Sequence, residues 1–171
     1  VEPKEDENAG WVYTDMLSKD PTNAGALSAL GMIKWQVEHN AEEAQSLFAE
    51  ALECCPEHRG ALYNFATISL MAKGNLERAA HYFGRSVSSD PTHVPSLHGL
   101  ARLMHVRDNA RAEELYERAL ALSPQQGEVM TDFGAFKEYI KGDRRAAWSL
   151  YESAAAVSPG NPHAASNHAR A

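Results

Sequence analysis

Histidine is the residue type with the clearest chemical potential in this chain of 171 residues, which contains eight of them. Histidines bind zinc where three or more ligands converge, and they exchange protons near neutral pH. His98 and His105 are seven residues apart and would share one face of a helix, but no third ligand accompanies them. His163 and His168 are five apart. We therefore expect structural or surface roles for the histidines, with no metal site and no cofactor.

Two cysteines and several paired carboxylates are the other residues that could carry chemistry. Cys54 and Cys55 are adjacent, which makes them poor disulfide partners, and two thiols are too few for a zinc site. A pair such as Glu113-Glu114 falls at an expected helix start, where acidic side chains favour the helix dipole. The sequence contains no phosphate-binding glycine loop, nucleophile elbow or His-Glu-x-x-His helix. We expect the chain not to be an enzyme.

The bulk composition excludes further classes of protein. Hydrophobic residues make up 44% of the chain, enough for one continuous core, but no apolar run approaches the roughly 18 residues of a membrane span. The net charge of -7 disfavours a nucleic-acid partner, because binding to phosphates is driven by cationic side chains. The chain starts at Val1 and stops within an expected helix at Ala171, so we expect a fragment of a longer protein. An intracellular, cytoplasmic location is the expectation, with the organelle left open.

Regularly spaced prolines organise the whole sequence. They are Pro21, Pro56, Pro91, Pro124 and Pro159. The intervals between successive members are 35, 35, 33 and 35 residues. A fixed period of this size indicates stacked supersecondary units. Proline cannot continue a helix, so each of these residues is expected to mark the joint between one unit and the next.

The residues around each proline repeat as well. An aromatic stands eight positions before each one, at Tyr13, Phe48, Phe83, Tyr116 and Tyr151. A small residue stands ten positions after each one, at Gly31, Ala66, Ala101, Gly134 and Ala169. Ala44 and Ala51, for example, lie four residues before and three residues after Phe48, which places all three on one face of a helix. Small residues allow two helices to approach, and the aromatic then fills the space between them.

This pattern predicts an all-α fold of antiparallel helix pairs. We expect a charged tail at 1–7 and a single array from 8 to 171. The array is expected to contain a half repeat at 8–20, repeats at 24–55, 59–90, 94–123 and 127–158, and a terminal helix at 162–171. Glycine followed by Asn or Asp, as in Gly74-Asn75 and Gly142-Asp143, fits the turn that ends one helix and starts another. The shorter turn around Asp108 explains the 33-residue interval.

The columns carry a resemblance to a known family. Its pattern of apolar, small, alanine, aromatic, alanine and proline positions is followed by Leu27, Leu30, Gly31, Ala44, Phe48, Ala51 and Pro56. The chain resembles the tetratricopeptide repeat over almost its whole length. That resemblance implies a right-handed α-solenoid, a superhelix whose first helices line a concave groove. It also implies a non-enzymatic scaffold that binds a peptide or helix of a partner protein.

Two alternatives for the function stay open. The segment from Tyr116 to Leu120, with sequence Tyr-Glu-Arg-Ala-Leu, is also similar to the half-a-tetratricopeptide repeats of RNA-processing scaffolds. The chain could instead be the regulatory arm of a larger enzyme. Self-association through the two ends of the array is a further expectation that the sequence leaves undecided.

The repeat register predicts which residues line the groove. They are Met32, Trp35, Tyr63, Asn64, Thr67, Leu70, Met71, His98, Arg102, His105, Glu128, Asp132 and Tyr139. The first half of this set is apolar, the third unit is cationic, and the fourth is acidic. A partner could therefore bury an apolar anchor near Trp35 and then meet Arg102 and Asp132 with opposite charges. Alternatively, Trp35, Leu70 and Met71 pack inside the array, and Arg102 pairs with Asp132.

The best-known binding site of the resembled family, a clamp for the C-terminal carboxylate of chaperones, does not fit. In the first register the clamp requires lysine at Ser28, asparagine at Met32 and at Asn64, and cations at Pro95 and Gly99. Only Asn64 matches, and shifting the register does not improve the agreement. We therefore expect binding of a protein segment without a carboxylate clamp.

Overall fold

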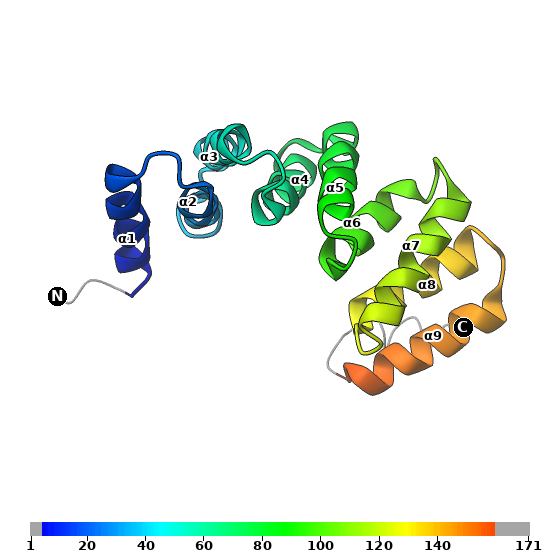
Figure 1. Cartoon of the computed structure of the whole chain (residues 1–171). Coiled ribbons are helices and arrows are strands. Elements are labelled where there is room, and N and C mark those ends of the chain that lie inside the picture. Colours follow the sequence, from blue (N-terminus) through cyan, green and yellow to red (C-terminus); the bar gives the residue numbers. More distant parts are fainter. Residues whose placement is uncertain (1–4, 160–171) are drawn as a thin grey trace. The chain divides into compact units, whose positions relative to one another are not determined.

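The computed structural model describes the backbone of residues 5–159 and, apart from residue 73, the side chains of residues 10–159. Within that range the chain is all-α and has no strand, which confirms the predicted fold class (Figure 1). The helices are α1 Glu5–Lys19, α2 Ala24–Gln36, α3 Ala41–Cys54, α4 Arg59–Lys73, α5 Leu76–Ser89, α6 Val94–Met104, α7 Asn109–Leu122, α8 Gly127–Tyr139 and α9 Arg144–Val157. The predicted terminal helix at 162–171 lies outside the described residues. Helix α1 begins at Glu5, three residues before the predicted start of the array at residue 8.

Helices that are neighbours along the chain form the pairs. Helix α2 packs on α3, α4 on α5, α6 on α7, and α8 on α9. We call α2, α4, α6 and α8 the first helices and α3, α5, α7 and α9 the second helices. The repeat prolines at 56, 91 and 124 fall between successive pairs. The period read from the sequence therefore marks the joints of the structure.

Packing divides the chain into two compact units, Val1–Pro91 and Thr92–Ala171. The sequence pattern predicts one uninterrupted array from 8 to 171 and gives no sign of this division. Its boundary falls at one of the repeat prolines, Pro91. In a repeat protein each element contacts only its neighbours, so a joint between two pairs is the natural place for such a division.

Aromatic side chains fill the centre of each pair. Phe48, Phe83, Tyr116 and Tyr151 are at most 3% exposed. A Cβ added to Gly31 would lie 2.7 Å from Cε1 of Phe48, and one added to Gly134 would lie 2.5 Å from Cε1 of Tyr151. At these two positions the absence of a side chain is what lets the aromatic ring fit. The second and third pairs instead carry fully buried alanines, Ala66 and Ala101.

Side-chain caps start the second helices. In each case an Asn or Asp oxygen accepts a hydrogen bond from the backbone N–H three residues later. The capping residues are Asn40, Asn75, Asp108 and Asp143. These caps satisfy amides that the helix itself leaves without partners. The positions of the predicted turns are thereby explained by ordinary helix chemistry.

The turns within three of the pairs share one geometry. A residue with positive φ ends the turn: His39 at 55°, Gly74 at 57° and Gly142 at 71°. The next N–H then donates to the carbonyl six residues earlier, as Asn75 does to Ser69 at 3.0 Å. Helices α2 and α8 end before this turn, at Gln36 and Tyr139.

The third pair has a tighter turn. Asp108 N–H donates to the carbonyl of Met104, four residues earlier, at 2.9 Å. Between α6 and α7 none of the described residues has positive φ. The two residues missing from this turn account for the 33-residue interval between Pro91 and Pro124.

Helix α1 has the pattern of a second helix, but no described first helix pairs with it. Its column residues are correspondingly less covered. Tyr13 is half-buried and Met16 is 39% exposed, whereas Phe48 and Ala51 at the same repeat positions of α3 are fully buried. Trp11 on the same helix is 66% exposed. The predicted self-association through the array ends remains a prediction.

Candidate partner-binding surface

The residues predicted to line the groove all retain access to solvent. We call the thirteen residues given above, which lie on or next to the first helices α2, α4, α6 and α8, the lining set. Met71, Arg102, Glu128 and Tyr139 are exposed, and the other nine are half-buried. Residues on the opposite face of the same helices, such as Leu62 in α4, are buried in the core. The periodicity therefore separates the core face from an accessible face on every first helix.

In the first unit the apolar members of the lining set differ in how far their side chains are exposed. Met32 and Trp35 pack against the core cluster that contains Phe48 and Leu62. The indole of Trp35 is therefore half-buried, and an apolar anchor of a partner near Trp35 stays a prediction. Met71 is 69% exposed, so the alternative in which it packs inside the array is wrong.

The neighbours of Met71 on α4 are more constrained. The ring of Tyr63 lies 5.8 Å from that of Phe83, in a tilted arrangement. Thr67 uses its hydroxyl to donate to the carbonyl of Tyr63 at 2.9 Å, a bond within its own helix. Leu70 and Asn64 are half-buried. Helices α2 and α4 pack side by side, so Met71 provides the most exposed apolar contact on this part of the surface.

In the second unit a polar cluster joins α6 to α8. His98 Nε2 lies 2.8 Å from Oδ2 of Asp132, and Arg102 Nε lies 3.3 Å from the same oxygen. The predicted pairing of Arg102 with Asp132 is confirmed. Two residues that are one helical turn apart on α6 thus converge on one carboxylate of α8. Glu128, four residues before Asp132, is exposed.

The electrostatics of this cluster keep Asp132 ionised. Partial burial would by itself raise the pKa of its carboxyl. The hydrogen bond from His98 and the charges of Arg102, His98 and His105 outweigh burial and lower the pKa. The carboxylate is therefore a permanent hydrogen-bond acceptor at neutral pH.

A buried tyrosine provides a second contact beneath this surface. His105 Nε2 lies 2.7 Å from the hydroxyl of Tyr116, whose side chain is fully buried. The Tyr116 ring stacks on Phe133 at 5.0 Å, and His105 lies 5.1 Å from Phe136. Burial raises the pKa of Tyr116, so the phenol keeps its proton and can donate it to a neutral imidazole.

A correlation between two repeat positions could have revealed this contact from the sequence. Trp35, Leu70, His105 and Glu138 occupy the same position near the end of the four first helices. The aromatics of the second helices opposite them are Phe48, Phe83, Tyr116 and Tyr151. This position thus holds an apolar residue where the aromatic is phenylalanine and a polar residue where it is tyrosine. Tyr151 donates to Glu138 at 3.0 Å, as a buried phenol requires a partner.

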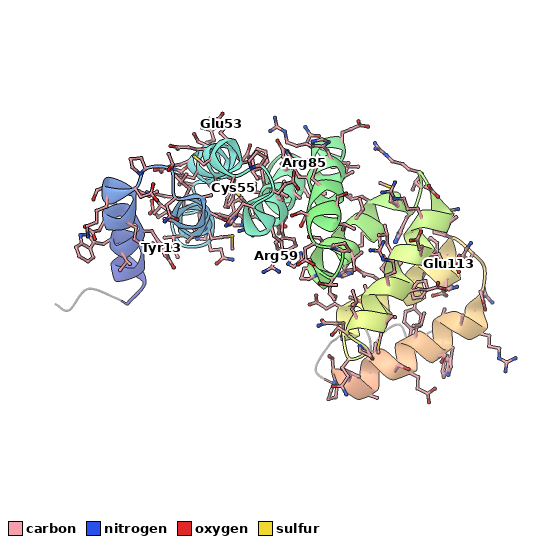
Figure 2. The ribbon with its side chains drawn as sticks, viewed as in Figure 1. Tyr13, Glu53, Cys55, Arg59, Arg85 and Glu113 are labelled. Atoms are coloured by element: carbon pink, nitrogen blue, oxygen red, sulfur yellow. The ribbon has the colours of Figure 1, made fainter. Side chains whose placement is uncertain are left out.

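A carboxylate on α7 holds two lysines of the last pair. Glu113, labelled in Figure 2, accepts from Lys137 and lies 2.8 Å from Lys141 Nζ. These hydrogen bonds, with that from Lys137 the stronger, lower the pKa of Glu113. Lys137 Nζ also lies 5.0 Å from the centre of the Phe133 ring. The lysines are thereby engaged with α7 and the aromatic core.

The remaining residues with chemical potential stay apart. Cys54 and Cys55 are exposed free thiols. Over residues 10–159, apart from residue 73, no three His, Cys, Asp or Glu side chains gather as metal ligands. Within the described part of the chain, no helix has the length and apolar character that crossing a membrane requires.

Acid should weaken the fold through His105. Burial lowers the pKa of this histidine from 6.5, Arg102 and His98 lower it further, and Asp132 opposes them. The folded chain then binds fewer protons than the unfolded chain below about pH 6.5, so stability falls as the pH drops through that value. We expect His105→Gln, whose amide can still accept from Tyr116, to show a smaller loss of melting temperature between pH 7.5 and about 5.

The matched control for this measurement is His81→Gln, at an exposed histidine of α5. It should retain the pH dependence of the unsubstituted chain. The pH range of the measurement stays above about 5, because the stability that the lowered pKa of Asp132 contributes is lost only below about pH 3.8. Equal pH dependence in the His105→Gln and His81→Gln variants would show that His105 carries no such linkage.

Paired helices with an aromatic against a small residue, and prolines at the joints, define the tetratricopeptide-repeat fold, which this chain adopts. The solved structure of YrrB, a tetratricopeptide-repeat protein with an unusual peptide-binding site, matches 97% of this chain and 84% of its own at a TM-score of 0.74 and 21% identity. Thermophilic TTC0263 from Thermus thermophilus matches 96% and 89% at 0.71 and 16% identity. Pseudomonas aeruginosa pilF matches 93% and 72% at 0.79 and 22% identity.

These likenesses are structural. No protein-family model and no curated protein matches the sequence. At such identities the similarity shows the fold, and the function has to be argued from the side chains.

Proposed function

We propose that this chain is a protein-interaction scaffold that binds a peptide or helix of a partner protein in a concave groove lined by its first helices. No catalytic step and no chaperone-type carboxylate clamp is part of this function. The observation that carries the proposal is the accessibility of the lining set, none of whose thirteen members is buried. A face that is apolar in places, solvent-accessible and repeated on every first helix is suited to contact an elongated partner.

The composition of the lining set favours protein over nucleic acid. Met71 and Tyr139 are 69% and 64% exposed, and large apolar and aromatic side chains are enriched at protein interfaces. Arg102 on this face is paired with the carboxylate of Asp132, and the chain carries a net charge of -7. Phosphate binding would require an excess of cations. The structurally similar protein YrrB has a peptide-binding site, which also supports a peptide as the partner of this chain.

The test begins with a displayed library of random 12-residue peptides selected against the purified chain. Binding of each selected peptide is then measured by fluorescence anisotropy. We expect each peptide to lose at least tenfold in affinity with Met71→Glu or with Tyr139→Glu, because a charge would be forced against an apolar contact. Both side chains are well exposed, so circular dichroism should show unchanged folding.

Leu76→Glu is the matched control. Leu76 is 51% exposed, but it starts a second helix, where a carboxylate suits the helix dipole. This variant should bind all selected peptides with wild-type affinity. Failure to select any peptide, or binding that survives both Met71→Glu and Tyr139→Glu, would contradict the proposed function.

A further inference from the structure

The Arg102–Asp132 pair has unused hydrogen-bonding capacity on the accessible face. Both His98 and Arg102 contact the same oxygen of Asp132, Oδ2. Among the described residues, Oδ1 accepts no hydrogen bond, and the terminal guanidinium nitrogens of Arg102 donate none. An arginine carries five N–H donors, so its two terminal nitrogens remain able to donate. Arg102 is 57% exposed and Asp132 is 36% exposed at their side chains, so solvent reaches both.

A donor fork beside an acceptor oxygen is complementary to a peptide backbone. An extended segment presents a C=O acceptor and an N–H donor at close spacing, and those groups are unpaired at a strand edge. A carboxylate on the partner would bind Arg102 but would be repelled by Asp132 and by exposed Glu128 one turn away. A cation on the partner would be repelled by Arg102. The neutral backbone is the group that both members of the pair can bind.

Tyr139 supplies a second contact at a defined distance. It lies seven residues after Asp132 on α8, which is two helical turns on the same face, or about 10.5 Å along the axis. Its side chain is 64% exposed and makes no hydrogen bond or ring contact with the described residues. An extended chain advances about 3.3 Å per residue, so about three residues of a partner span this distance.

We propose that Arg102 and Asp132 bind the backbone of an extended segment of a partner protein. Tyr139 then holds an apolar side chain of the segment about three residues away. This inference rests on the proposed function and specifies its ligand in the second unit: an extended segment rather than a helix, recognised through its peptide group and one apolar residue. Beyond its first turn, a helical partner has its backbone N–H groups bonded internally, so the side of a helix could not make the contact with Asp132.

The first experiment compares arginine variants with the selected 12-residue peptides as probes. Arg102→Ala should weaken the peptides that depend on Tyr139 by at least tenfold, as expected for hydrogen bonds to a charged group. The matched control, Arg145→Ala, removes an exposed arginine of α9 and should change affinity by less than about twofold. Tyr139→Phe should retain binding, because the contact uses the ring rather than the hydroxyl.

The second experiment identifies the group that is recognised. Each peptide is resynthesised with single N-methyl groups, which remove one N–H and leave every side chain intact. One N-methyl position should cost at least tenfold on the wild type and much less on Asp132→Ala, where the acceptor is already absent. Asp132→Asn keeps an oxygen acceptor, so it should bind the peptides more tightly than Asp132→Ala does. Equal losses in the two variants would indicate that either substitution disturbs α8.

The outcomes separate this inference from the proposed function. Peptides that bind but are indifferent to Arg102→Ala and to every N-methyl group would overturn the inference and leave the scaffold function standing. Peptides that respond instead to replacing an Asp or Glu by its amide would show that Arg102 reads a carboxylate, which also overturns it. Selection of no peptide would remove the proposed function and this inference together.

Discussion

Ala66→Trp should lower the free energy of unfolding by more than about 2 kcal/mol, because overpacking a close helix contact forces side chains and backbone apart. Ala66 is fully buried in α4, at the small position opposite the aromatic of its pair, Phe83. The measurement is urea unfolding followed by circular dichroism.

Ala72→Trp provides the comparison on the same helix. Ala72 is exposed, so the new ring extends into solvent and the substitution costs only the lower helix propensity of tryptophan, roughly 0.5 kcal/mol. The same propensity loss applies at position 66, so the difference between the two variants isolates the packing effect. Equal unfolding midpoints for both variants would show that the small column of the repeat does not lie at the helix contact.

Gly134→Leu is expected to have an effect of similar size in the last pair. A Cβ at this position would lie 2.5 Å from Cε1 and 2.8 Å from Cδ1 of Tyr151, so the ring would have to move. The ring is fully buried, and its hydroxyl is held by Glu138 at 3.0 Å. We expect a loss of more than about 2 kcal/mol, despite the better helix propensity of leucine.

The same substitution at Gly84 tests whether space is the reason. Gly84 lies within α5, and no atom lies within 4 Å of a Cβ built there. Gly84→Leu should leave stability unchanged or raise it by up to about 1 kcal/mol, because glycine is a poor helix former. Comparable losses at positions 84 and 134 would mean that the helices of the last pair are not held closely at Gly134.

The period of the prolines and the aromatic column was sufficient to predict the helix pairs. The starts of the second helices α3, α5, α7 and α9 each carry a local signal in the sequence, such as the Asn40 cap of α3. The ends of α2, α6 and α8 were less accessible to sequence reasoning. After α2 and α8 the chain turns through a residue with positive φ, such as His39, whereas none of the described residues in the shorter turn after α6 has positive φ.

Surface and core were harder to distinguish for large side chains. The register placed Trp35 and Met71 on the same predicted face, yet Trp35 packs on the core while Met71 is 69% exposed. Periodicity gives the direction in which a side chain leaves its helix. It does not give the reach of an indole, which at Trp35 is long enough to pack against the core cluster.

The polar contacts of the second unit were only partly predictable. The pairing of Arg102 with Asp132 follows from their opposite charges at repeat positions that differ by three residues, about one helical turn, on two successive first helices. The contact of His105 with Tyr116 depends on a phenol where other copies have phenylalanine, and its signal is the exchange of apolar for polar residues at the opposing position. That correlation was present in the sequence, but it requires comparing two columns rather than reading either one alone.

Packing of each helix mainly on its sequence neighbour has a kinetic consequence. Chain closure costs little when the segments to be joined are separated by one short turn, and topologies dominated by local contacts reach the native state quickly. The partners of α2, α3, α4 and α5 within their own unit all precede residue 92. The first unit can therefore fold on the ribosome before the second has been synthesised. Its apolar faces are then exposed to aggregation only briefly.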